Sequence, residues 1–363
     1  MEIKCYQCKK PIVGNYIRIG DRSFHPDCFT CKYCKKPING PYQNDGSKYY
    51  HSDCYKKVKG YVCDHCGELL GEVWQVYNNK KYHQGCYEKY YQPRCDICGL
   101  PIQDKYTTDD KGKYHASCYR EHKLPKCDIC LRPIEGEYIK DVWGHKAHKH
   151  HNGQKTVTCD TCSRILSSAT SNGAFKYSDG RYICGYCKAG AIENIESAKR
   201  YVPEILKQLS QYGMKGIPNN IPIFLVDRNQ LAKISNNKFS KDTKGFTKIE
   251  TKLLNNVKVS SSYEIYILFG LQELAFKGTL AHELLHVWQF EHNARLSKIE
   301  SEGFCNLGSA IIYESGSSQL ATILLDNLKN DPDPIYGAGY RKMSKKLESI
   351  GWAKLLDQVR GTR

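Results

Sequence analysis

The sequence has no apolar run long enough to cross a membrane, which argues against a membrane-spanning protein. It also has no block of five or more consecutive Lys or Arg residues. Its 54 basic residues are distributed over the whole length of the 363-residue chain. That spread argues against nucleic acid as a partner, although the formal net charge is +16. The first expected metal ligand is already residue 5, so we expect no secretory signal ahead of it.

Disulfide bonds are not expected either, although the chain has 19 cysteines. Almost all of them stand in CxxC and HxxC pairs, a spacing that suits metal ligands and is poor for disulfides. We therefore expect a reducing, cytoplasmic setting.

The first half of the chain repeats one metal-binding pattern. From the second CxxC pair onward, the pairs begin at intervals of 32 residues, and in the first four sets sixteen residues separate a CxxC pair from the HxxC pair that follows it. These four predicted sets are Cys5, Cys8, His25 and Cys28; Cys31, Cys34, His51 and Cys54; Cys63, Cys66, His83 and Cys86; and Cys95, Cys98, His115 and Cys118.

Two further sets complete the pattern with different ligands. Cys127 and Cys130 are followed by a histidine cluster, from which the spacing favours His148 and His151 over His145 with His148. The sixth predicted set is Cys159, Cys162, Cys184 and Cys187. These closed, thiolate-rich sets are typical of structural zinc, so we predict six structural zinc ions, with Cys305 left over.

The spacing in residues 5–54 matches the LIM pattern in full, since only two residues separate Cys28 from Cys31. The later units are LIM-like, because eight residues lie between one unit and the next. We predict a LIM domain at 1–58, LIM-like zinc units at 59–121 and 122–189, and a different domain at 190–363. The array is expected to bind a protein partner; a structural spacer or a lid is the alternative.

After Cys187 cysteine almost vanishes and long apolar patterns begin. Residues 190–212 read as a helix that Pro203 should kink or split. Residues 221–227 and 263–269 read as buried strands, and residues 280–291 as an amphipathic helix with Thr279 as its N-cap.

The predicted helix at 280–291 contains the HExxH pattern, His282-Glu283-Leu284-Leu285-His286. Four residues of helix advance by about 400°, so both imidazoles lie on one face and can bind one Zn²⁺. The intervening Glu283 is then the general base that takes a proton from a water activated by the metal.

A catalytic zinc needs a third protein ligand, and the sequence offers two candidates. His292 has the metzincin spacing, but Gln289 replaces the glycine at which the metzincin chain turns. Glu302 precedes Gly303 at the start of a second apolar helix, an arrangement that resembles gluzincin peptidases. We favour Glu302, with Glu300 as the fallback.

Two further features belong to the expected active site. The strand at 263–269 stands where gluzincins have the sheet edge that binds an extended peptide, although an ordinary core strand is compatible with the same pattern. Residues 336–340 read as a flexible glycine-rich turn, from which Tyr336 is the favoured donor to the oxyanion.

Several separated sequence blocks occur in the same order as in one known family. These blocks are YILFGLQELAFKGTLAHELLHVWQ, ESEGFCNL and DPIYGAGYR. They are similar to the plant DA-one family of ubiquitin-activated LIM peptidases and its bacterial relatives. The resemblance implies a cytosolic gluzincin-like endopeptidase with His282, His286 and Glu302 as ligands and Glu283 as base. Since no ubiquitin-interacting helix precedes the zinc array, activation by ubiquitin is not carried over.

The predicted fold is therefore a small, β-rich zinc-ribbon array of LIM and LIM-like units followed by an α+β gluzincin-like metallopeptidase domain. The predicted function is cleavage of protein or peptide substrates with one catalytic Zn²⁺, with the array recruiting or regulating. The alternative is a LIM-type interaction scaffold with a dormant peptidase domain. Eighteen thiolates subtract eighteen charges and seven zinc ions add fourteen, so the net charge stays basic at +12.

Overall fold

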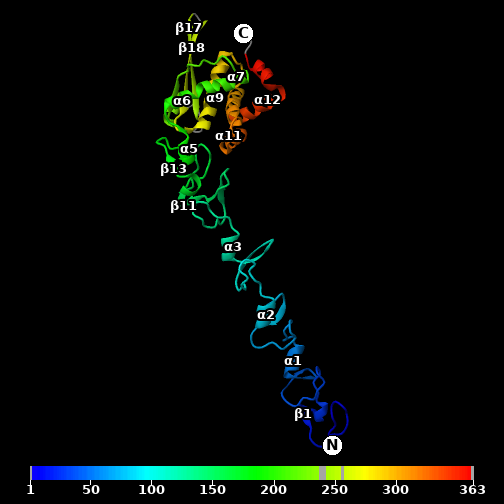
Figure 1. Ribbon diagram of the computed structural model, residues 1–363. Helices are drawn as coiled ribbons and strands as arrows, with labels where there is room; N and C mark the ends of the chain where they lie inside the picture. Colours follow the sequence, from blue (N-terminus) through cyan, green and yellow to red (C-terminus); the bar gives the residue numbers. More distant parts are fainter. Residues whose placement is uncertain (1, 237–242, 255–256, 361–363) are drawn as a thin grey trace. The chain divides into compact units, whose positions relative to one another are not determined.

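A computed structural model describes residues 2–236, 243–254 and 257–360. The chain divides into two compact units, residues 1–124 and 125–363. The first unit holds the first four cysteine sets. The second unit holds the fifth and sixth sets together with the helical part of the chain (Figure 1).

The zinc units of the first unit repeat one small fold. A β-bridge closes each CxxC knuckle, as between Lys4 and Pro11, and an antiparallel hairpin follows it. A short helix then begins directly after the histidine. The elements are β1 (Ile17–Ile19), β2 (Arg22–Phe24), η1 (Pro26–Cys28), β3 (Tyr42–Asp45), β4 (Lys48–His51), α1 (Ser52–Val58), β5 (Trp74–Tyr77), β6 (Lys80–His83), α2 (Gln84–Tyr90), β7 (Tyr106–Asp109), β8 (Gly112–His115) and α3 (Ala116–His122).

The fifth and sixth zinc units open the second compact unit. Their short hairpins and helices are β9 (Tyr138–Lys140), β10 (Lys146–His148), β11 (His150–His151), β12 (Gln154–Lys155), α4 (Ser168–Ser171), β13 (Ala174–Lys176), β14 (Tyr182–Cys184) and α5 (Gly185–Ala189). Next comes β15 (Ala191–Ile192), which pairs with β19 (Leu271–Gln272) just before the helix that carries the HExxH pattern.

A three-stranded sheet supports that helix, in the order β16-β18-β17. Strand β18 (Val257–Leu268) pairs in parallel with β16 (Ile223–Val226) and antiparallel with β17 (Gly245–Leu254). The strand expected at the sheet edge is therefore the central strand, and that expectation was wrong. The two edge strands are β16, which matches the predicted strand at 221–227, and β17, which was not predicted.

The helices are α6 (Ile195–Arg200), α7 (Val202–Gln211), α8 (Arg228–Ile234), α9 (Glu273–Glu291), α10 (Lys298–Glu314), α11 (Gln319–Lys329) and α12 (Tyr336–Val359). Pro203 splits the first pair as expected, because it stands in the first turn of α7, where its missing N–H costs no helical bond.

Two expectations about the helix ends were wrong. Helix α9 begins before Thr279, because the Gln272 side chain caps it, and the Thr279 hydroxyl donates to Ala275 O inside the helix. Residues 336–340 open α12 and do not form a flexible turn. Their glycines are needed for close packing, since a Cβ on Gly339 would lie 2.3 Å from Ile299 O.

The core of the second unit lies around α9, which packs on the sheet on one side and on α10 on the other (Figure 1). Leu284, Trp288 and Phe304 are completely buried there. Helix α10 in turn packs against α11 and α12. Polar side chains on facing turns of α9 and α10 thus lie next to a large apolar core.

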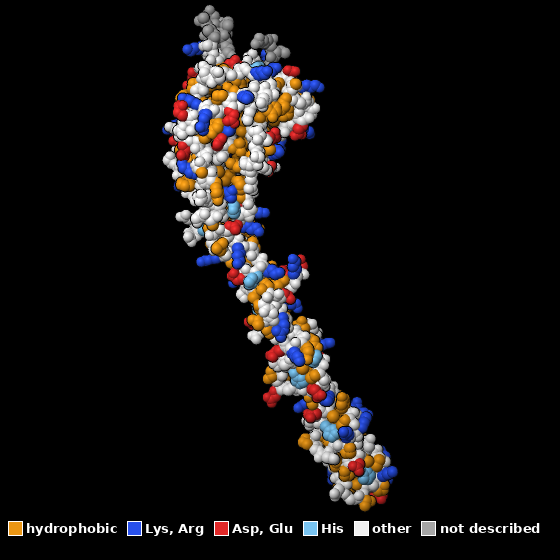
Figure 2. All heavy atoms as spheres, viewed as in Figure 1, with side chains coloured by type: hydrophobic (Ala, Val, Ile, Leu, Met, Phe, Trp, Pro, Cys, Tyr) orange, Lys and Arg blue, Asp and Glu red, His pale blue; other side chains and the backbone are white. Residues whose placement is uncertain are grey.

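Within the described ranges, no helix is both long and apolar enough to span a membrane. Figure 2 shows Lys and Arg side chains interspersed with Asp and Glu over the visible face of both units. The visible face therefore carries no separate basic patch.

Candidate active site and metal centres

The structure brings together the ligands of all six predicted zinc sets. In the first five, including the set with His148 and His151, one candidate ligand atom from each residue lies within 4.8 Å of all the others. In the sixth, Cys162 Sγ lies 3.6 Å from Cys184 Sγ, while Cys159 Sγ and Cys184 Sγ accept backbone N–H groups of Cys184 and Cys187.

The histidines of the first four sets are oriented in one way. The Nε2 atom of His25 lies 3.2 Å from Pro11 O, and Nδ1 lies 3.4 Å from Cys8 Sγ. Since a carbonyl oxygen only accepts, Nε2 carries the proton and Nδ1 turns its lone pair toward the thiols. The corresponding Nε2–carbonyl distances are 3.1 Å for His51, 2.8 Å for His83 and 3.1 Å for His115.

The surroundings of the first cysteine in each of these CxxC pairs favour its thiolate form. Burial opposes ionisation of Cys5, but backbone N–H groups of Cys8, His25 and Gln7 lower its pKa to about 6. A thiolate at neutral pH is the form that binds zinc. The same arrangement lowers the pKa to about 6 at Cys31, Cys63, Cys95 and Cys127.

The histidine cluster of the fifth set divides as its spacing predicts. His151 Nε2 lies 3.2 Å from Cys127 Sγ, and His148 Nδ1 lies 3.6 Å from Cys130 Sγ. His145 is directed elsewhere, because its Nδ1 lies 2.9 Å from the buried carboxylate of Asp141.

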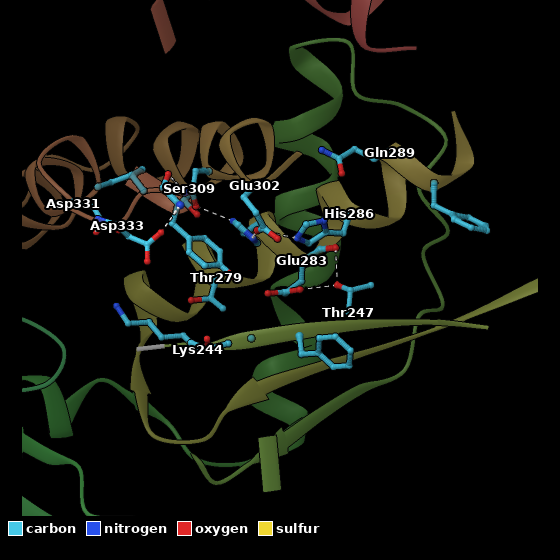
Figure 3. A pocket seen from close by; sticks show the side chains of 18 of the residues that line it. Lys244, Thr247, Thr279, Glu283, His286, Gln289, Glu302, Ser309, Asp331 and Asp333 are labelled. Carbon is cyan, nitrogen blue, oxygen red and sulfur yellow. Dashed lines mark hydrogen bonds and ion pairs between the residues drawn. The ribbon is translucent and has the colours of Figure 1, made fainter. Parts of the chain in front are cut away.

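A separate cluster lies between α9 and α10 (Figure 3). The Nε2 atoms of His282 and His286 lie 3.2 Å and 3.5 Å from the same atom, Glu302 Oε2. All three side chains line one cavity, of about 1020 Å³. Of the two third-ligand candidates, Glu302 is the one that meets both histidines.

The hydrogen bonds of His282 test whether this cluster suits a metal ion. The Asn306 amide donates through Nδ2 to Tyr336 O, which turns its Oδ1 toward His282 Nδ1 at 2.8 Å. His282 therefore donates from Nδ1, and in the neutral imidazole the lone pair of Nε2 faces Glu302 Oε2. Two lone pairs face each other across 3.2 Å, a contact that a bound cation would make favourable. The residues fit a zinc ion.

Charge in this cluster points the same way. Burial alone would raise the pKa of Glu302, but its contacts with His282 and His286 hold that pKa well below its usual range, so the carboxylate is ionised as a metal ligand must be. Burial raises the pKa of the Cys305 thiol to about 11, so this thiol is neutral at pH 7. Its Sγ lies 3.4 Å from His286 Nδ1 and orients that ring.

The other two candidate ligands are used elsewhere. His292 ends α9, stacks on Trp288 and directs Nδ1 to Trp288 O. Glu300 closes a capping box with Ser297 at the start of α10 and pairs with Lys342 at 2.8 Å.

Glu283 and Tyr336 line the same cavity as the three ligand candidates. Glu283 is 4% exposed, and Thr247 of β17 hydrogen-bonds its carboxylate. Burial raises the pKa of Tyr336 well above its ordinary value, so its phenol keeps its proton. The Tyr336 ring centroid lies 6.4 Å from that of His282.

Sequence reasoning missed two residues of the site, Asn306 and Thr247. The former was detectable as the polar residue one helical turn beyond Glu302, on the same face of the helix. The latter belongs to β17, whose signal was the alternation of Thr247, Ile249 and Thr251 with charged residues.

Comparison with known proteins places a LIM domain at the start of the chain. Residues 5–59 match the LIM domain family. LIM domains mediate protein–protein interaction.

About half of the chain is also similar to three proteins of Arabidopsis thaliana. It is 24% identical to Protein DA1-related 7 over 242 residues, 23% identical to Protein DA1 over 241 residues and 24% identical to Protein DA1-related 1 over 244 residues. These matches cover 50–51% of this chain and 43–45% of each relative. The chain thus spans less than half the length of the curated relatives that it matches.

Proposed function

We propose that residues 190–363 form a gluzincin-like, zinc-dependent endopeptidase domain that acts on protein or peptide substrates. The convergence of His282, His286 and Glu302 beside the buried Glu283 carries this proposal. Two imidazoles and one carboxylate are a common ligand set of hydrolytic zinc, which leaves one position open. The similarity of about half of the chain to the DA1 proteins is in keeping with this proposal.

A zinc ion held by these three residues would polarise a carbonyl group and acidify water. Side chains of the protein would transfer the protons and stabilise the oxyanion. Glu283 accepts the proton of the attacking water and then delivers it to the leaving amine. Tyr336 keeps its phenolic proton and donates a hydrogen bond to the developing oxyanion.

The cavity suits an extended peptide. Residues Gly245, Phe246, Thr247 and Ile249 of the edge strand β17 line it, so a substrate strand could add to this edge. Leu324 and Leu328 of α11 line it as well and offer an apolar surface to a substrate side chain.

The direct test is cleavage of fluorescently labelled casein by the zinc-loaded chain and by Glu283→Gln. We expect the substitution to lower the rate by about 100-fold or more, since the base is lost while the metal ligands remain. The exposed Glu314 lies on α10, and Glu314→Gln is the matched control that should keep the wild-type rate. Equal rates for wild type and Glu283→Gln would rule the mechanism out.

We also infer that the LIM domain and the LIM-like units recruit a protein partner or regulate the peptidase. Exposed apolar side chains on the first unit suit such a contact, for example Val13 at 94%, Val73 at 72% and Leu100 at 62% exposure. A folded, zinc-loaded chain that cleaves no protein would instead favour a LIM scaffold with a dormant peptidase domain.

A further inference from the structure

The carboxylate of Glu283 rests against the first residues of the edge strand β17. The Thr247 hydroxyl lies 2.7 Å from Glu283 Oε2 and 3.0 Å from the backbone oxygen of the same residue (Figure 3). A hydroxyl has one proton, and its stronger hydrogen bond is the one to the charged oxygen. One of the two carboxylate oxygens is thereby held in place.

Gly245 provides the space for the other carboxylate oxygen. A Cβ at this position would lie 2.5 Å from Glu283 Oε1 and 2.9 Å from Thr279 Cγ2, which is too close for either contact. Residues two apart on a strand point to the same face, so Gly245 and Thr247 both face α9. Together they form the surface against which the Glu283 side chain packs.

Gly245 and Thr247 are held by strand pairing to the core of the second unit. Thr247 pairs with Ile265 and Gly245 pairs with Ile267, and both isoleucines of the central strand are completely buried. A side chain held by such a rigid element loses little orientation when substrate arrives. The same strand also lines the cavity into which a peptide would enter.

We propose that Thr247 is a positioning residue for the general base: its hydroxyl fixes Glu283 Oε2, and Gly245, on the same face of the strand, leaves the space in which Oε1 can accept a proton from the reacting water. This inference rests on the proposed peptidase function. Misplacing a catalytic group by about 1 Å can cost roughly 100-fold in rate, so the loss of the hydroxyl should be measurable.

The experiment compares Thr247→Val with Thr247→Ser, using initial rates over a range of labelled casein concentrations. We expect Thr247→Val to lower kcat roughly 10- to 100-fold with little change in KM, melting temperature or zinc content. Thr247→Ser keeps the hydroxyl and should restore most of kcat. Thr251→Val, farther along the same strand and exposed, should behave as wild type.

A readout that does not depend on turnover is a crystal structure of zinc-loaded Thr247→Val. We expect the Glu283 side chain to occupy more than one rotamer there, and a single one in wild type. If Thr247→Val does not fold, Thr247→Ala takes its place with the same expectations.

The outcomes separate this inference from the proposed function. A zinc-loaded wild type that cleaves nothing would overturn both. Cleavage by wild type with an unchanged kcat in Thr247→Val would overturn only the role of Thr247. A loss of kcat that comes with lost zinc or a lowered melting temperature, and that serine does not rescue, would assign Thr247 a structural role and overturn the inference as well.

Discussion

At the scale of single residues, the two histidines of the site are fixed by partners behind them. Asn306 holds His282 and Cys305 holds His286, each through Nδ1, so both rings turn Nε2 to a common point. Such outer partners set the tautomer and the direction of a ligand.

We predict that Asn306→Ala lowers zinc affinity at this site by roughly 10- to 100-fold, because His282 loses the group that fixes its tautomer. Competition with a graded series of chelators measures the affinity. Asn327→Ala, an exposed residue that also lines the cavity, is the control. An affinity equal to that of wild type would show that Asn306 does not orient His282.

A second prediction concerns a buried ion pair within the sixth zinc unit, whose two side chains also form hydrogen bonds with the backbone of Arg228 and Phe269. Asp179 Oδ2 lies 2.9 Å from Arg181 Nε and accepts the backbone N–H of Arg228 at 3.1 Å, while Arg181 Nη2 donates to Phe269 O. We expect Asp179→Asn to lower the free energy of unfolding by about 3 kcal/mol, because the Arg181 charge would stay buried without its partner. Urea unfolding at saturating zinc measures it.

The pH dependence of that effect follows from the pKa of Asp179. Burial opposes ionisation, but the N–H groups of Arg228 and Arg181 and the Arg181 charge lower this pKa below its ordinary value of about 3.9. The stabilisation is complete above the unfolded pKa and is lost only as the pH falls below it. The difference between wild type and Asp179→Asn should thus stay constant from about pH 8 to pH 5. Asp357→Asn, at an exposed pair, should change little at either pH.

The residue types and their spacing made most of the candidate ligands, which the structure brings together, predictable from sequence. Glu302 could be preferred to His292 because six helical residues rotate a side chain away from the metal face. Thr279 was wrongly predicted to be the N-cap, because the sequence alone does not distinguish a threonine inside a helix from one at its start. In the structure the side chain of Gln272 caps the first turn instead. Contacts between distant residues, such as Thr247 with Glu283, have no signal in either local sequence.

At the scale of elements, the site depends on how closely α10 and α12 approach each other. A Cβ on Gly303 would lie 2.2 Å from Gly339 O, so two glycines face each other beside Glu302. Gly303→Ala would force the helices apart and shift the ligand next to it.

We predict that Gly303→Ala lowers the free energy of unfolding by about 2 kcal/mol or more and weakens zinc binding at this site. Thermal unfolding and the zinc content of the purified protein measure the two effects. Gly190→Ala serves as control, since its Cβ would meet Gln272 side-chain atoms at 3.4 Å or more. An unchanged stability would mean that the helices can separate freely.

The elements themselves were predicted unevenly. Strands 221–227 and 263–269 and the split at Pro203 could be predicted from local signals, as could the helix that contains Glu302. Strand β17 was missed, and with it the order of the sheet, because a pairing partner far along the chain decides which strand lies at an edge. Glycines at 337 and 339 suggested a turn, but Gly339 permits close helix packing and Gly337 leaves room for the backbone of Asp331.

At the scale of the whole molecule, one chain contains two kinds of predicted metal site. The zinc units have small cores built around their cysteines, such as Cys95, Ile102 and Tyr114. Such units depend on metal for folding. The site between α9 and α10 lies instead beside a large apolar core.

The most direct measurement is zinc content per chain for wild type and for the double variant His282→Ala/His286→Ala. We expect about seven zinc ions in wild type and six in the variant, because six sets are closed by their own ligands. The double variant His145→Ala/His292→Ala removes two histidines outside the predicted sites and should keep about seven. Six ions in both wild type and the His282/His286 variant would contradict a separate metal at this site, and the peptidase proposal would fall with it.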